Sequence, residues 1–150
     1  MTSNANTKER IAALGLLWLS ILMGAGIAYH GYGKIFGGEY FGANVEGFAG
    51  GVAKMGFPMP LFFAWCAALA EFAGGIFVAL GLFTRAAALF VFFNMSVAAF
   101  VAHSNDPMKV KELALAYWTM SGALVLMGGG CLSLDKLLFC GKCKSESKTD

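Results

Sequence analysis

Glu71 is the residue whose type and position most clearly suggest chemistry. It is the only charged residue between Leu61 and Phe83, in a run that is otherwise apolar. An ionised side chain at the centre of a lipid bilayer costs at least roughly 2.5 to 3.5 kcal/mol, so an acid in such a segment is a functional candidate by default. The positions three and four residues away are Ala67, Ala68, Gly74 and Gly75. In a helix these small residues share the face of Glu71 and let another helix approach, so we expect the acid to point into a helix bundle.

The sequence supports two roles for this acid. Glu71 has no oppositely charged neighbour on its own helical face, and burial without a partner favours the neutral form of a carboxyl group. A neutral acid suits a proton relay or a hydrogen bond to a polar ligand, so we predict Glu71 as the catalytic residue. The structural alternative is a protonated donor that holds two helices together, with Asn94 in the third apolar run as its partner.

Two histidines and a lysine form a second candidate group. His30 and His103 each end an apolar run, and Lys34 follows His30 by four residues, so the two share a face if the first helix continues that far. Both runs end on the same side of the predicted bundle. Counting helix rise from Pro60 places Glu71 about 15 to 20 Å below that surface, so a ligand or a water would have to mediate contact between His30 and Glu71.

These polar residues permit three interpretations. The first is a pocket for a polar headgroup such as a quinone ring, bound without a covalent link and lined by His30, Lys34, Glu71, Asn94 and His103. The second is haem b with His30 and His103 as its axial ligands. The third has no ligand, only interfacial histidines and a lysine that extends toward the lipid headgroups. No metal-ligand spacing is present, so we predict no mononuclear metal site.

The four cysteines fall into two groups. Cys66 and Cys131 lie inside apolar runs, where a thiol is typically a small packing residue. Cys140 and Cys143 form a CxxC motif beside lysines, which is typical of a redox dithiol or of half a zinc or iron–sulfur site. One such motif is an incomplete metal site, so we interpret the pair as incidental or as part of a docking surface.

The composition defines the elements that must position these residues. The chain has 150 residues, of which 58% are hydrophobic and 13% charged. Its mean hydropathy is +0.67, which excludes a soluble globular or a disordered protein. The net charge of +2 is small, so we expect no nucleic-acid partner. Four apolar runs long enough to cross a bilayer lie at about 11–30, 60–83, 86–103 and 112–132.

We therefore predict an all-α integral membrane protein with four transmembrane helices in an antiparallel bundle. Residues 1–10 form a short N-terminal segment, 11–138 the membrane domain and 139–150 a polar tail. The first run is long enough to be an uncleaved anchor instead of a signal peptide. Seven Lys and Arg residues lie on the side of the two termini and of a turn at Thr84–Arg85, against four on the other side. This bias predicts that both termini are cytoplasmic and gives Arg85 a role in topology.

The first outer loop, from Gly37 to Phe57, contains a predicted short helix. Its apolar residues recur at helical spacing, and Asn44 precedes them in the position of an N-terminal cap: Val45, Phe48, Ala49 and Val52. We expect this helix to lie in the interface between membrane and water.

Several of these segments together resemble the DoxX family. The resemblance covers about residues 11–138. It is carried by His30-Gly31-Tyr32-Gly33-Lys34, Gly47-Phe48-Ala49, Ala53-Lys54-Met55-Gly56-Phe57-Pro58-Met59-Pro60, Ala64-Trp65, Ala70-Glu71, Gly74-Gly75, Gly81-Leu82-Phe83-Thr84-Arg85, His103 and Ser133-Leu134-Asp135. It implies a small four-helix protein of the prokaryotic inner membrane, in a family named after a subunit of terminal-oxidase and thiosulfate:quinone oxidoreductase systems. The family positions to test are His30, Lys34, Glu71, Arg85 and His103.

The leading hypothesis is therefore a membrane subunit of an electron-transfer complex, not a stand-alone enzyme. A quinone or another lipid-soluble carrier would bind near the outer face, where Glu71 handles a proton, His30 and Lys34 orient the headgroup and His103 exchanges protons. The expected partners are membrane lipid and either other subunits of a redox complex or further copies of the chain. The main alternative is a non-catalytic anchor or assembly subunit that docks a partner enzyme.

Two lesser alternatives are the haem subunit and a thiol-redox membrane protein. The thiol chemistry is that of the related MauE-like group. The sequence departs from that group because its CxxC motif lies in a short tail.

Overall fold

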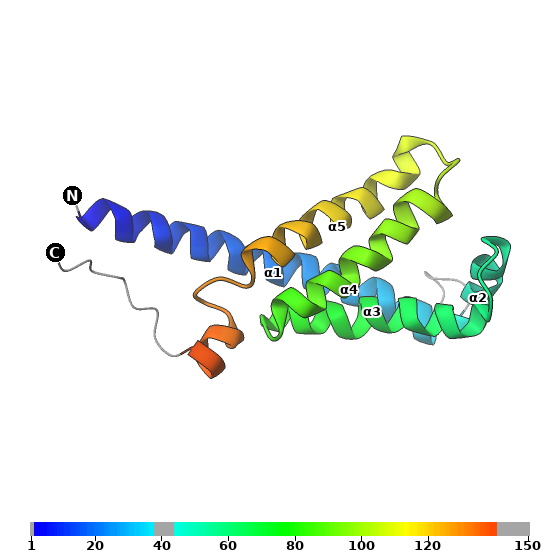
Figure 1. Cartoon of the computed structure of the whole chain (residues 1–150), viewed down its shortest axis with the longest axis horizontal. Coiled ribbons are helices and arrows are strands. Elements are labelled where there is room, and N and C mark those ends of the chain that lie inside the picture. Colours follow the sequence, from blue (N-terminus) through cyan, green and yellow to red (C-terminus); the bar gives the residue numbers. More distant parts are fainter. Residues whose placement is uncertain (1, 38–43, 141–150) are drawn as a thin grey trace.

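The computed structural model describes residues 2–37 and 44–140, with side chains described for 7–37 and 44–138. This part of the chain is helical and contains no strand. Its elements are α1 (Thr2–Phe36), α2 (Val45–Lys54), α3 (Pro60–Leu80), α4 (Thr84–Val97), the π-helical turn η1 (Ala98–Ala102) that continues α4, α5 (Met108–Met127) and the π-helical turn η2 (Lys136–Cys140). The four long helices alternate in direction, with α2 and the α4–α5 connection at one end and the α3–α4 connection and η2 at the other (Figure 1).

Three helices are long and apolar enough to cross a membrane: Thr7–Phe36, Pro60–Leu80 and Thr84–Ala102. They correspond to the first three predicted spans. The fourth predicted span corresponds to α5, which has Lys109, Lys111 and Glu112 near its start and is not among the three. The all-helical membrane fold is thus confirmed, whereas the count of four spans stays a prediction.

The outer surface of the helices is apolar. Large side chains such as Trp18, Phe90 and Leu126 point outward and are exposed. Soluble monomers rarely present so much contiguous apolar surface, and such a surface is typical of a protein that lipid covers.

Glycines bring α1 and α3 into close contact. A Cβ atom on Gly75 would lie 2.5 Å from the backbone nitrogen of Ala28 and 2.7 Å from the carbonyl oxygen of Gly24. On Gly31 it would lie 2.8 Å from the carbonyl carbon of Glu71. Any larger residue at these positions would push the helices apart. The prediction that the small residues beside Glu71 admit a neighbouring helix is therefore confirmed at Gly75, and that neighbour is α1.

The main core among the described residues is an apolar cluster shared by the four long helices. Its fully buried members include Met23, Ile27, Val78, Ala88, Val91 and Leu124. Gly74 belongs to this packing, because a Cβ atom there would lie 3.1 Å from Cγ2 of Val91 on α4. Gly74 and Gly75 thus face different helices and fix the position of α3 between them.

The connection between α3 and α4 differs from the predicted turn at Thr84–Arg85. Gly81 follows α3 with a φ of 68°, in the left-handed region that glycine favours, and α4 already begins at Thr84. The carboxylate of Asp135 accepts hydrogen bonds from the backbone nitrogens of Phe83 at 2.5 Å and Thr84 at 2.8 Å. It thereby satisfies free N–H groups at the start of α4. The connection thus lies at 81–83, and the predicted turn at Thr84–Arg85 is wrong. The sequence gives no local signal for this, because the residue that caps α4 lies 51 positions away.

The short helix predicted in the first outer loop is present as α2. Asn44 is its N-cap, and the side chain accepts a hydrogen bond from the backbone nitrogen of Gly47. Val45, Ala49 and Val52 are buried in a small cluster that also contains Ala64 of α3. The helix and its cap are thus confirmed, and its place in a membrane interface stays a prediction.

Candidate functional site

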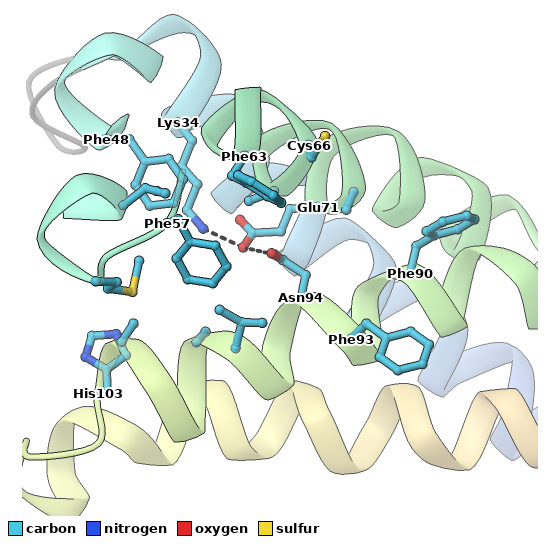
Figure 2. A pocket seen from close by; sticks show the side chains of 17 residues that line it. Lys34, Phe48, Phe57, Phe63, Cys66, Glu71, Phe90, Phe93, Asn94 and His103 are labelled. Carbon is cyan, nitrogen blue, oxygen red and sulfur yellow. Dashed lines mark hydrogen bonds and ion pairs between the residues drawn. The ribbon is translucent and has the colours of Figure 1, made fainter. Parts of the chain in front are cut away.

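Glu71 is buried at the meeting point of three helices. Its side chain on α3 is 1% exposed, and its Oε1 lies 2.5 Å from Nζ of Lys34 on α1. Nδ2 of Asn94 on α4 donates a hydrogen bond of 2.8 Å to the same oxygen. Figure 2 shows Lys34 and Asn94 reaching Glu71 from different helices. The contact with Asn94 that the structural alternative predicts is present, but Glu71 is its acceptor and not its donor. The ion pair with Lys34 means that the acid is paired and not isolated.

The second carboxylate oxygen of Glu71, Oε2, lacks a hydrogen-bond partner among the described residues. It is also buried. Leaving a buried acceptor unsatisfied costs about 1 to 3 kcal/mol, and more for a charged group. The site therefore carries an acceptor that the fold itself does not use.

Lys34 reaches Glu71 because α1 is longer than predicted. The sequence predicts that the first span ends near residue 30, whereas α1 continues to Phe36 and places Lys34 in its last turn. The ammonium also lies over the ring of Phe48 on α2, 4.7 Å from its centroid, in the geometry of a cation–π contact. Lys34 thus contacts Glu71 directly, a pairing that was not predicted from the sequence.

His30 does not contact the acid directly. Its ring packs edge-on against Tyr117 of α5, with the centroids 5.9 Å apart. No hydrogen bond joins His30 to Glu71 in the described part of the chain. The interpretation that a ligand or a water would have to connect them stays a prediction.

An apolar cavity of about 390 Å³ opens beside the ion pair. Its walls come from α2, α3, α4 and the segment between α2 and α3, and they include the aromatic rings of Phe48, Phe57, Phe63, Phe90 and Phe93. The polar residues that line it are Lys34, Glu71, Asn94 and His103. An apolar chamber with a few converging polar groups is the usual form of a small-molecule site. We call it the larger cavity.

A second cavity of about 220 Å³ also borders the ion pair. Its lining includes His30 of α1, Tyr117 of α5 and again Lys34, Glu71 and His103. The ion pair therefore borders two cavities, and four of the five residues predicted to bind a ligand line this second one. Asn94, the fifth, lines the larger cavity.

His103 lies where the π-helical turn η1 ends. Its Nδ1 is 2.7 Å from Oδ2 of Asp106, and its side chain is partly exposed. π-helical turns are rare and occur often at functional sites. The sequence reading missed Asp106, although a carboxylate three residues after a histidine is a signal that could have found it. His103 thus connects the cavities to a charged group at the surface.

Arg85 lies at the other end of the bundle. Its guanidinium donates a hydrogen bond of 3.2 Å to the carbonyl oxygen of Leu126, which joins the start of α4 to the end of α5. No described contact joins it to the cavities. The geometry agrees with the structural role predicted for Arg85 and separates it from the ligand group.

The cysteines differ from the sequence reading in one respect. Cys66 is free and exposed and lines the larger cavity. Cys131 is disulfide-bonded, so the expectation of a packing thiol there is wrong. The motif at Cys140 and Cys143 lies outside the residues whose side chains are described. Within the described residues, no group of three or more His, Cys, Asp or Glu side chains could hold a metal ion.

Comparison with known proteins gives consistent matches. The sequence profile of the DoxX family matches residues 9–104. Inner membrane protein YqjF of Escherichia coli (strain K12) is 35% identical over 134 residues, which cover 87% of this chain and 96% of that protein. Inner membrane protein YphA of the same strain is 34% identical over 105 residues, or 62% of this chain and 75% of that protein. No solved structure matches the chain.

Proposed function

The chain belongs to the DoxX family, and on that premise we propose that it is a membrane subunit of an electron-transfer complex that binds a quinone or a similar lipid-soluble carrier. Its relatives are named inner membrane proteins, and three of its helices are long and apolar enough to cross a bilayer. The proposal therefore places it in the inner membrane of a prokaryotic cell.

The proposal also includes the number of spans and the side of the membrane on which the termini lie. The long helices alternate in direction, which supports α5 as a fourth span. Both termini are then on one side, and the excess of Lys and Arg there favours the cytoplasm. The cavities and α2 lie toward the opposite, outer side.

The observation that carries the proposal is the buried ion pair at the wall of the larger cavity. A chamber of about 390 Å³ with aromatic walls suits an apolar ring, and the Glu71 carboxylate gives it one strong point of polar recognition. In this proposal Glu71 contacts the head of the carrier and takes part in its proton exchange. Lys34 and Asn94 hold the carboxylate in place, and His103 with Asp106 exchanges protons with the solvent.

The test compares Glu71→Gln with the matched variant Glu46→Gln, which changes an exposed acid on α2 outside both cavities. Each protein is extracted from its own membranes in mild detergent, and native mass spectrometry identifies bound small molecules and subunits. We expect wild type and Glu46→Gln to retain a quinone and a redox subunit. Glu71→Gln should lower quinone-linked turnover by roughly a hundredfold, since general acid–base groups contribute about that much.

Two outcomes would count against the proposal. Full turnover by a correctly folded Glu71→Gln protein would remove Glu71 from the mechanism. A wild-type protein that carries neither quinone nor redox subunit would overturn the carrier site and favour the anchor or assembly role instead.

Haem is a second candidate ligand on one observation, namely that His30 and His103 line the same smaller cavity. Two facing imidazoles are a known way to hold haem b. A Soret band in the purified protein that disappears in His30→Ala would support this alternative, and a protein without that band would exclude haem from the purified state.

A further inference from the structure

We propose that the larger cavity selects ligands whose polar head donates a hydrogen bond. A lipid-soluble phenol, the class that includes quinols, would bind in preference to the same skeleton with only carbonyl or ether oxygens. This inference rests on the proposed function, because it specifies which chemical form of a lipid-soluble carrier the site holds.

The first step concerns the open oxygen of Glu71. In its ion pair with Lys34 the side chain is a carboxylate, which can accept hydrogen bonds but cannot donate them. Lys34 and Asn94 both donate to Oε1, whereas Oε2 has no partner among the described residues. A ligand that bonds to Oε2 must bring an O–H or N–H group.

The second step concerns the donors beside the acid. The ammonium of Lys34 is directed to Oε1 and to the face of the Phe48 ring, and the amide nitrogen of Asn94 is directed to the same Oε1. His103, the remaining titratable residue that lines the cavity on α4 and η1, lies away from this group and pairs with Asp106 (Figure 2). Each of these donor groups thus already has an acceptor, whereas Oε2 of Glu71 has no donor among the described residues.

The third step concerns the rest of the ligand. Phe90 and Phe93 line the cavity and are also 67% and 60% exposed, and Cys66 on α3 is exposed as well. The cavity therefore reaches the molecular surface between α3 and α4. In a membrane this surface faces lipid, so an apolar tail can extend from the cavity into the bilayer while the head stays at Glu71.

The experiment uses a matched pair of probes, a long-chain alkylphenol and its methyl ether, which lacks the donor but keeps the ring, the oxygen and the tail. Binding to the full-length protein in lipid nanodiscs is measured by equilibrium dialysis, with empty nanodiscs to correct for partition into lipid. We expect the phenol to bind about tenfold more tightly, because hydrogen bonds to charged groups are stronger than neutral ones. The pair of probes requires no redox reaction.

Two variants locate the preference. Glu71→Gln replaces the open carboxylate oxygen with an amide group that can present N–H, so the phenol should lose its advantage over the ether. Glu46→Gln makes the same chemical change on an exposed part of α2 and should keep the advantage. The comparison of the two probes on wild type stands even if Glu71→Gln fails to fold.

The outcomes separate this inference from the proposed function. Tighter binding of the phenol, lost only in Glu71→Gln, supports both. Equal binding of phenol and ether to wild type overturns the donor preference and leaves the carrier site in place. Binding of neither probe overturns both proposals.

Discussion

Two carboxylates in different regions of the bundle have opposite surroundings. Asp135, beside the α3–α4 connection, uses both oxygens, one for the backbone nitrogen of Phe83 and one for that of Thr84. Glu71 is more deeply buried, yet only its Oε1 has partners among the described residues. The fold thus completes the hydrogen bonding of the more accessible acid and leaves the more buried one incomplete.

This difference assigns different roles to the two acids: Asp135 is structural, and Glu71 is the candidate functional group. Most buried polar groups in proteins are satisfied, so an exception requires an explanation. Asp135 needs none, because it fixes the start of a helix. Glu71 also lines a cavity large enough for a ring, and in our proposal a ligand supplies the missing partner of Oε2.

The largest effect is expected from removal of the lysine. Lys34→Met leaves the buried carboxylate of Glu71 without its counter-charge, and breaking a buried pair in this way costs about 3 kcal/mol or more. Unfolding in detergent would measure the loss. The double variant Lys34→Met/Glu71→Gln should recover part of it, because the amide is uncharged. A double variant no more stable than Lys34→Met would contradict the assignment of the loss to the charge.

A smaller effect is expected where α1 and α3 touch. Gly75→Ala places a methyl group 2.5 Å from the backbone of Ala28, and overpacking of this kind costs about 1 to 3 kcal/mol. Gly15→Ala is the matched control, since no atom lies within 4 Å of a Cβ atom there, and it should be neutral or slightly stabilising. Thermal unfolding of the two variants measures the effect. Equal unfolding temperatures would show that the close contact between α1 and α3 at Gly75 does not contribute to stability.

The smallest effect is expected at Asp135, the other carboxylate of this comparison. Asp135→Ala removes the cap of α4 and should lower stability by about 1 kcal/mol, a typical value for a lost helix cap. The alkylphenol should bind as tightly as it does to wild type, because Asp135 lines neither cavity. Lys136→Ala, at the next position, controls for a general disturbance of η2. Weaker phenol binding by Asp135→Ala would show that Asp135 also affects the ligand site, and it would contradict the division of roles between Asp135 and Glu71.

The helices were predictable because apolar runs of bilayer length leave the backbone few alternatives. The cap at Asn44 was also predictable, since capping depends on neighbouring residues. The bounds of the turn at Thr84 were not, because they depend on Asp135, far away in sequence. Local patterns thus predict local structure, and they fail where a distant side chain completes it.

The sequence was sufficient to predict which residues form the candidate site, but not which of them contact one another. Glu71 stood out as an acid in an apolar run, and Asn94 was its partner in the structural alternative. The pairing with Lys34 was not expected, because it depends on how far α1 continues and how closely it crosses α3. The sequence carries no simple signal for that geometry, which follows from the glycine contacts between the two helices.

The π-helical turn η1 has a consequence for how the family can vary. The backbone nitrogen of His103 donates to the carbonyl oxygen of Ala98 five residues earlier, where an α-helix would use the residue four positions earlier. The wider turn absorbs one extra residue and keeps His103 above Ala98. Removal of a single residue between Ala98 and Ala102 would therefore restore α-helical spacing and leave the histidine near the cavities that it now lines.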